Sequence, residues 1–204
     1  MSKGNLFILS GPSGSGKDTV LAKVFEKYPD IYFSISSVTR AMRKGEKQGD
    51  KYNFITREKF EQMIKDNLLL EYNLFVDNYY GTPREPVEKC IKEGRDVIIE
   101  VDVNGAYNIR KNYRNAVSIF IMPPSLEILK NRLSGRETDS AKVIESRTKA
   151  ALSEIARAGE YDYIVVNNEL DRAVEDVCAI IRSCSLKIEN QEHLIKEVLG
   201  LERN

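Results

Sequence analysis

The chain of 204 residues has no tryptophan, a single histidine, only three cysteines and no net charge. The histidine, His193, lies in a charged segment near the C-terminus, which disfavours a mechanism built on a histidine triad. The cysteines Cys90, Cys178 and Cys184 are odd in number and form no Cys-x-x-Cys pair. Such cysteines are typical of small, reduced core residues, so we expect no cysteine metal site.

Charge and hydropathy exclude further classes of protein. Basic and acidic residues number 31 each, whereas a generic nucleic-acid or membrane binder carries a basic excess. No apolar run is long enough to span a bilayer, and no signal peptide is recognisable. We therefore expect a cytoplasmic protein with no nucleic-acid or membrane partner. The apolar fraction of 42% and charged fraction of 30% suit one soluble α/β domain with a small insertion.

Four short apolar runs predict the central sheet. They are residues 5–10, 96–101, 116–121 and 161–166. Stretches with helical periodicity separate them, beginning with residues 19–28. Apolar strands that alternate with helices indicate a parallel sheet covered by helices on both faces, joined by right-handed crossovers.

Two segments interrupt this alternation. The polar, tyrosine-rich segment 37–86 predicts a mixed α+β insertion, with strands in 52–55 and 68–80 and a helix at 57–65. The segment 124–159 predicts two helices flanking the charged stretch 134–140, which we expect to be exposed and mobile. The chain after residue 187 predicts one more amphipathic helix.

The segment 11–17 reads Gly-Pro-Ser-Gly-Ser-Gly-Lys and matches the phosphate-loop pattern Gly-x4-Gly-Lys. Glycines let backbone N–H groups turn inward, and the following helix directs its positive end at the same point. Lys17 adds a full charge. A buried strand before the loop and an amphipathic helix after it favour the binding of a nucleoside triphosphate. The predicted donor residues are Gly11, Pro12, Ser13, Gly14, Ser15, Gly16, Lys17, Asp18 and Thr19.

Asp18 departs from this pattern. The residue after the lysine is usually Ser or Thr, whose hydroxyl binds Mg²⁺. The Asp18 carboxylate has two possible roles: it ligates Mg²⁺, for which oxygen ligands are suited, or it adds a negative charge beside the phosphates. Thr19 is expected to point elsewhere on the helix. The sequence leaves both roles open.

Ordered motifs in the insertion identify a family. Residues 34–46 read Ser-Ile-Ser-Ser-Val-Thr-Arg-Ala-Met-Arg-Lys-Gly-Glu, residues 71–72 read Glu-Tyr and residues 79–81 read Tyr-Tyr-Gly. The family's Asp-Tyr-x-Phe run reads Lys-Tyr-Asn-Phe at residues 51–54. In kind and order these motifs resemble the guanylate kinase family over nearly the whole chain. The resemblance implies transfer of the γ-phosphoryl group of ATP to GMP or dGMP in purine nucleotide metabolism, with Mg²⁺.

The resemblance also implies residue roles in the acceptor site. The side chains expected to hold the GMP phosphate are Arg40, Arg43, Tyr52 and Tyr80. Arginine forks match phosphate oxygens, and phenols donate without adding charge. Glu71 is expected to accept from N1–H and the 2-amino group of guanine, while Ser36 and Thr82 donate to O6. Adenine leaves Glu71 without partners, and sites with unpaired buried polar groups reject the wrong ligand.

Glu100 and Asp102 follow the apolar run that begins at residue 97. Side chains alternate along a strand, so we expect both carboxylates on one side, at the ligand-binding end of the sheet. By resemblance they lie near the acceptor nucleotide and the waters of the metal. The alternative is a solvated strand end.

The segment 124–159 contains Arg132, Arg136 and Arg147, and by resemblance it corresponds to the lid of nucleoside monophosphate kinases. The resemblance implies that Arg136 and Arg147 reach the transferring phosphoryl group and that Arg132 contacts the adenine side or the phosphates. The alternative for Arg147 is an ion pair with Glu145 or Glu154. Phosphoryl transfer needs charge placed on the migrating group, so the predicted catalytic residues are Lys17, Arg40, Arg136 and Arg147.

We thus expect a core of residues 1–36, 87–123 and 160–204, a GMP-binding insertion of 37–86 and a lid of 124–159. Three rival hypotheses remain: a kinase for another monophosphate or a sugar bisphosphate, a phosphopeptide-binding module without catalysis, and a GTPase switch. The guanine set argues against the first, the intact Lys17 against the second, and the absent Asn-Lys-x-Asp motif against the third. The sequence leaves monomer or homo-oligomer undecided.

Overall fold

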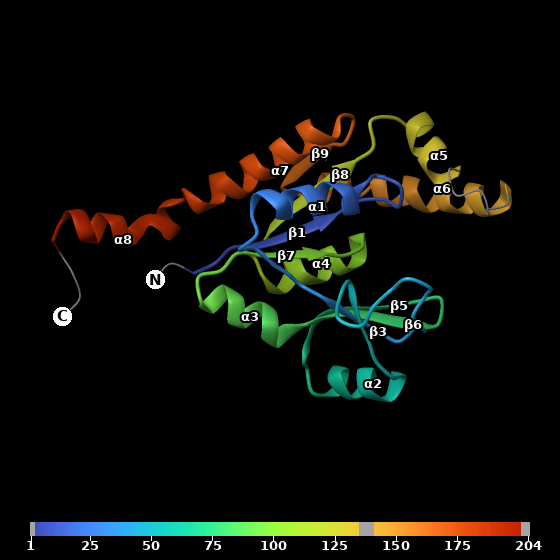
Figure 1. Ribbon diagram of the computed structural model, residues 1–204, viewed down its shortest axis with the longest axis horizontal. Coiled ribbons are helices and arrows are strands. Elements are labelled where there is room, and N and C mark those ends of the chain that lie inside the picture. The colour runs from blue at the N-terminus through green and yellow to red at the C-terminus, as the bar shows by residue number, and fades with distance from the viewer. Residues whose placement is uncertain (1–2, 135–140, 201–204) are drawn as a thin grey trace.

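A computed structural model describes residues 3–134 and 141–200. Its centre is a five-stranded parallel sheet of order β2-β7-β1-β8-β9 (Figure 1). The strands are β1 Leu6–Ser10, β2 Tyr32–Phe33, β7 Val97–Glu100, β8 Val117–Met122 and β9 Tyr163–Val166. The predicted α/β fold, a parallel sheet flanked by helices, is confirmed.

Helices cover both faces of this sheet. One face packs against α1 Lys17–Lys27 and α7 Leu170–Ser185, and the other against α3 Arg84–Lys92 and α4 Val103–Asn112. The neighbours Ile8 and Leu9 of β1 point to opposite faces and are 0% and 1% exposed. This two-sided burial explains why β1 reads as a continuous apolar run instead of an alternating one.

A second, four-stranded sheet has the order β4-β3-β6-β5. Its strands are β3 Ser36–Val38, β4 Tyr52–Phe54, β5 Leu69–Phe75 and β6 Asn78–Pro83, and α2 Arg57–Lys65 lies between β4 and β5 in the chain. Helix α2 buries Phe60, which stacks on Tyr79 of β6. The antiparallel register of β5 and β6 places Glu71 opposite Thr82.

Helices α5 Leu126–Ser134 and α6 Ala141–Ile155 pack together through Leu129, Leu133 and Ala151. In Figure 1 this pair lies at the end of the molecule farthest from α8. A 3-10 turn, η1 Ala158–Glu160, then leads into β9. Of the stretch that we predicted to be mobile, residues 135–140 lie outside the described residues, and Arg136 is among them.

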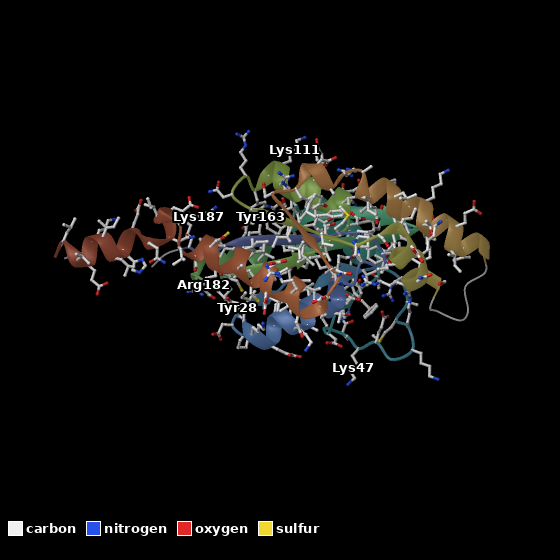
Figure 2. All side chains as sticks on the ribbon, turned by 90° about the horizontal axis from the view of Figure 1, so that it is seen from above. Tyr28, Lys47, Lys111, Tyr163, Arg182 and Lys187 are labelled. Carbon is white, nitrogen blue, oxygen red and sulfur yellow. The ribbon has the colours of Figure 1, made fainter. Side chains whose placement is uncertain are left out.

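The helix predicted after residue 187 is α8 Ile188–Val198. It buries none of its residues and extends beyond the body from its start near Lys187 (Figure 2). Near its first turn the Asn190 side-chain amide donates to the Asn5 side chain at 2.9 Å. None of the described helices is long and apolar enough to cross a membrane.

The carboxyl ends of the parallel strands meet at one edge of the sheet. There β1 leads into the glycine loop and β9 into Asn167, while β7 ends at Glu100. We expected that strand to run on to Asp102. It stops earlier because Asp102 is the N-cap of α4 and accepts from the backbone N–H groups of Asn104 and Gly105 at 3.0 and 2.7 Å.

Candidate active site

The glycine loop after β1 has the backbone that an anion site requires. Gly11, Gly14 and Gly16 have φ of 143°, 85° and 88°, a region that favours glycine. A Cβ at Gly11 would lie 2.4 Å from the Ile121 carbonyl oxygen of β8. Gly16 is the N-cap of α1, so the N–H groups of the first helical turn face the loop. These glycines are therefore required by geometry as well as by pattern.

Lys17 is the first residue of α1, and its side chain points back to the start of the loop. Its ammonium donates to the carbonyl oxygens of Gly11 and Pro12 at 2.8 and 3.2 Å. The charge lies where the loop N–H groups converge, and a lysine of this kind binds phosphate as a point charge. Sequence analysis assigned Lys17 to the outer phosphates of a triphosphate, and its position agrees with that role.

Asn167 and Arg132 support the loop from behind. The Asn167 amide donates to the Ser15 carbonyl oxygen at 2.8 Å, and Asn167 is 6% exposed. Arg132 of α5 donates to the carbonyl oxygens of Ser15 and Asn167 at 3.3 and 3.0 Å. Arg132 thus lies beside the glycine loop, where its guanidinium binds backbone carbonyl oxygens. From the sequence we expected only that the polar turn at Asn167 and Asn168 approaches adenine, and its hydrogen bond to the phosphate loop was not predicted.

Arg147 of α6 also reaches the loop. Its guanidinium donates to the Ser13 hydroxyl at 3.1 Å. Glu154, one of the two partners considered for Arg147, lies close to the loop itself. Burial raises the pKa of the Glu154 carboxyl, while the Lys17 ammonium and a hydrogen bond from the Ser13 backbone lower it. The face of α6 that meets the loop therefore carries both a cation and a carboxylate.

Arg40, at the end of β3, is held in one orientation. It donates to both carboxylate oxygens of Glu46, at 2.6 and 2.7 Å, and to the Ala41 carbonyl oxygen at 3.1 Å. Its guanidinium carbon lies 5.2 and 5.3 Å from the ring centres of Tyr52 and Phe54. Of the five guanidinium N–H groups, two bind neither Glu46 nor Ala41. That geometry suits a fork for a phosphate.

Glu46 orients the Arg40 side chain, and we predicted no role for it from the sequence. It also accepts from the Arg43 backbone N–H at 2.7 Å. Hydrogen bonds from Arg40 and Arg43 hold the pKa of the Glu46 carboxyl at about 2. Glu46 closes the Arg-x-x-Arg-x-Gly-Glu run, which was the signal that could have identified it. The Arg43 side chain is exposed, on the same turn.

Two tyrosines lie beside the Arg40 guanidinium. Tyr52 of β4 and Tyr80 of β6 lie edge to face, with ring centres 6.2 Å apart. Burial, followed by the Glu100 charge, raises the pKa of Tyr52, so its phenol stays a hydrogen-bond donor. The structure therefore brings together four residues that sequence analysis expected around one phosphate: Arg40, Arg43, Tyr52 and Tyr80.

Glu71 of β5 is a buried carboxylate in the same sheet as Tyr52 and Tyr80. It is 8% exposed, and the Thr82 hydroxyl donates to it at 2.8 Å. Burial, with a smaller contribution from Asp102, raises the pKa of Glu71 to about 7. A Cβ at Gly105 in the first turn of α4 would lie 3.0 Å from Glu71 Oε2, so the glycine lets the helix close one side of the carboxylate. Ser36 opens β3, in the same small sheet.

The two carboxylates after β7 have different neighbours. Burial raises the pKa of Glu100, and the nearby charges are Asp18, Lys17 and Lys51. Asp102 caps α4 and accepts from the Asn73 amide of β5 at 2.9 Å. Glu100 thus belongs with the glycine loop, and Asp102 joins α4 to the sheet that carries Glu71. The structural role of Asp102 was not foreseen.

Asp18 lies in the first turn of α1. The ammonium of Lys51, the residue before β4, lies 3.2 Å from the Asp18 carboxylate. Within residues 3–134 and 141–200, no group of three or more His, Cys, Asp or Glu side chains could hold a metal ion. Mg²⁺ at kinase sites takes one or two carboxylates and completes its shell with phosphates and water. A single carboxylate beside the phosphate loop fits that arrangement, so Asp18 is compatible with Mg²⁺.

Comparison with known proteins agrees with this geometry. The family model for guanylate kinase matches residues 3–184. The guanylate kinase of Oceanobacillus iheyensis is 48% identical over 97% of this chain and 96% of its own, and that of Lactococcus lactis is 44% identical over 96% and 98%. The crystal structure of guanylate kinase from Anaplasma phagocytophilum superposes with a TM-score of 0.80 at 32% identity, covering 99% of this chain and 98% of that one. The chain belongs to the guanylate kinase family.

Proposed function

We propose that this chain transfers the γ-phosphoryl group of ATP to GMP or dGMP, giving ADP and GDP or dGDP, in purine nucleotide metabolism. The observation that carries the proposal is the buried Glu71–Thr82 pair. It lies in the small sheet that also carries Tyr52 and Tyr80, against the first turn of α4, the helix that follows β7. A carboxylate, a cation cluster and a phosphate loop are the parts that a guanine monophosphate kinase needs. The chain is an ATP:GMP phosphotransferase.

The donor binds at the loop. Backbone N–H groups of residues 11–16 and the start of α1 surround the β- and γ-phosphates, and Lys17 swings from the Gly11 and Pro12 carbonyl oxygens onto them. Arg147 supplies charge from the lid, residues 124–159. Arg136, outside the described residues, has the same role by family resemblance. Closing the lid also excludes water, which otherwise competes with the acceptor.

The acceptor binds in the insertion, residues 37–86. Arg40, Arg43, Tyr52 and Tyr80 hold the GMP phosphate, with Glu46 fixing the first two. Glu71 accepts from the N1–H and 2-amino groups of guanine, and Ser36 donates to O6. The single Thr82 hydroxyl proton, donated to Glu71 in the free protein, turns to O6 when guanine binds. None of these residues reads the sugar, which is consistent with use of dGMP.

Transfer is a matter of positioning and charge. The core, residues 1–36, 87–123 and 160–204, holds the donor while the insertion presents a GMP phosphate oxygen in line with the γ-phosphorus. Phosphoryl transfer of this kind needs no covalent intermediate on the protein. Mg²⁺, when bound with ATP, would supply positive charge against the outer phosphates. Asp18 would be its protein ligand, and Glu100 and Asp102 would lie near its waters. We place the reaction in the cytoplasm.

The test is ADP release from MgATP with GMP, dGMP, AMP, CMP and UMP in turn. We expect turnover with GMP and dGMP at least about 100-fold above the others, because an adenine or pyrimidine leaves the buried Glu71 unpaired. Preference for AMP or UMP would refute the guanine assignment. No turnover with any acceptor would instead favour a binding module on the same scaffold.

A further inference from the structure

The chain departs from the general phosphate-loop pattern at one residue and from its family's Asp-Tyr-x-Phe run at another, and the two residues lie in contact. Asp18 stands where a Ser or Thr usually follows the loop lysine, and Lys51 stands where the family's run has Asp before the tyrosine. In the structure the Lys51 ammonium lies 3.2 Å from Asp18 Oδ1. The positions are 33 residues apart in the numbering, and Lys51 supplies a counter-charge for Asp18.

This ion pair joins the two halves of the site. Asp18 follows Lys17 in the first turn of α1, which belongs to the large sheet. Lys51 directly precedes Tyr52 of β4, the edge strand of the small sheet. Tyr52 in turn borders Arg40 and Tyr80. The pair therefore connects the start of the donor helix to the strand that carries an acceptor tyrosine.

The surrounding charges make Lys51 more than a surface cation. Glu100 is half-buried behind the pair and interacts with Asp18, Lys17 and Lys51. Asp18 and Glu100 place two carboxylates beside the phosphate loop, which is more negative charge than a single Mg²⁺ ligand supplies, so they repel the donor and draw on the charge of Lys17. A second cation at this point balances Asp18 and leaves Lys17 for the phosphates.

We propose that Lys51 is a positioning residue for phosphoryl transfer, which neutralises Asp18 and holds β4, with Tyr52, against the start of the donor helix. The inference rests on the proposed guanylate kinase function. Both side chains are more than half exposed, so the pair is weak and sensitive to salt. Its effect is on geometry, where displacements of about 1 Å at a reacting centre are costly.

The test is a double-mutant cycle on kcat/KM for GMP. Lys51→Ala is expected to lower kcat/KM about fivefold, the upper range for an exposed ion pair. In the Asp18→Ser background the same change is expected to cost less than about twofold, because the partner is already gone. Equal losses in the two backgrounds would overturn the proposal.

A charge-reversal series separates positioning from structure. Lys51→Asp places a third carboxylate beside Asp18 and Glu100, and a loss of about tenfold or more is expected. Adding Asp18→Ser to Lys51→Asp places Ser after the loop lysine and Asp before Tyr52, and is expected to recover kcat/KM to within about threefold of wild type. A double variant as poor as Lys51→Asp alone would contradict the account.

The matched control is Lys47→Ala. Lys47 is an exposed lysine of the same loop that points away from the body, and its side chain binds no residue in the described part of the chain (Figure 2). The Lys47→Ala variant should keep kcat/KM within about twofold of wild type, and a loss equal to that of Lys51→Ala would overturn the proposal.

The midpoint of thermal unfolding of every variant is expected within a few degrees of that of wild type. If the wild-type protein does not use GMP, the proposed function fails; if it does but the cycle shows no coupling, only this inference fails.

Discussion

Glu46 accepts hydrogen bonds from Nη1 and Nη2 of Arg40, at 2.6 and 2.7 Å, and so fixes the guanidinium that we propose binds the acceptor phosphate. The pair is supported by the Arg43 backbone N–H, which donates to the same carboxylate. Arginine oriented in this way loses less freedom when it binds a phosphate than a mobile side chain does. The acceptor phosphate site is thus pre-organised by a residue that does not itself bind phosphate.

Glu46→Gln is expected to raise KM for GMP about five- to tenfold and to change kcat less. The neutral amide has one oxygen, so it no longer accepts hydrogen bonds from both Nη1 and Nη2 of Arg40 through two oxygens. Steady-state kinetics with GMP varied at saturating MgATP measures both constants. The control is Glu61→Gln, which removes a carboxylate paired with Arg57 at 3.0 Å on α2 of the same insertion. If both variants raise KM equally, Glu46 has no special part in the phosphate site.

GMP binding is expected to weaken as the pH falls through about 7. In the free protein Glu71 has a pKa raised from 4.5 to about 7 by burial, so it is protonated below that pH. Only the carboxylate accepts from both the N1–H and 2-amino groups, so affinity should fall about tenfold per pH unit below 7. Titration calorimetry from pH 5.5 to 8.5 measures this dependence.

The GMP phosphate itself titrates near pH 6, and a matched variant removes that ambiguity. Glu71→Gln retains the phosphate contacts but has no carboxyl to titrate. It should bind GMP more weakly at pH 8, and its affinity should change less between pH 7.5 and 6.5 than that of wild type. The same pH profile in both proteins would exclude Glu71 as the titrating group.

Arg147→Ala is expected to lower kcat about 100-fold or more while the dissociation constant for GMP stays within about threefold. The arginine reaches the loop from α6, and in the role that we propose, contact with the migrating phosphoryl group, its contribution arises mainly in the transition state. Lys149→Ala removes an exposed charge from the same helix and is the control. A loss in GMP affinity without a loss in turnover would place Arg147 in ground-state binding instead.

Asn167→Ala is expected to destabilise the fold by about 1–3 kcal/mol, because it leaves the buried Ser15 carbonyl oxygen without that hydrogen bond. Since Ser15 belongs to the phosphate loop, KM for ATP should rise as well. Chemical denaturation and ATP-dependent kinetics measure the two effects. The neighbouring Asn168 is exposed, and Asn168→Ala should change neither. Equal effects at both positions would point to a general change in the turn.

Elements with strong local signals were predictable. Helix α2 spans Arg57–Lys65, the residues predicted, because Thr56 accepts from the Lys59 N–H at its start and the chain turns at Asp66. The apolar runs of β1 and β8 were found within a residue or two of their ends. The two-residue strand β2 was missed, since Tyr32 and Phe33 are too few to show a period.

The site was predictable where motifs carried it and not where tertiary contacts did. Glu71 and Thr82 are eleven residues apart and meet through the hairpin register, which follows from local pattern. The contact of Asn167 with Ser15 spans 152 residues and has no local signal. Asp102 was expected within a strand, but capping of α4 ended the strand before it. The role of Asn167 thus depends on a long-range hydrogen bond, whereas Glu46, and Asp102 as the cap of α4, act on residues at most six positions away.

The most direct test of the account is to follow the γ-phosphoryl group itself. ATP carrying an isotopic label in that group is incubated with GMP, Mg²⁺ and the protein, and the products are separated. The account predicts that the label appears in the β-phosphate of GDP, with little in inorganic phosphate. Label in inorganic phosphate or on the protein, with GMP unchanged, would contradict it.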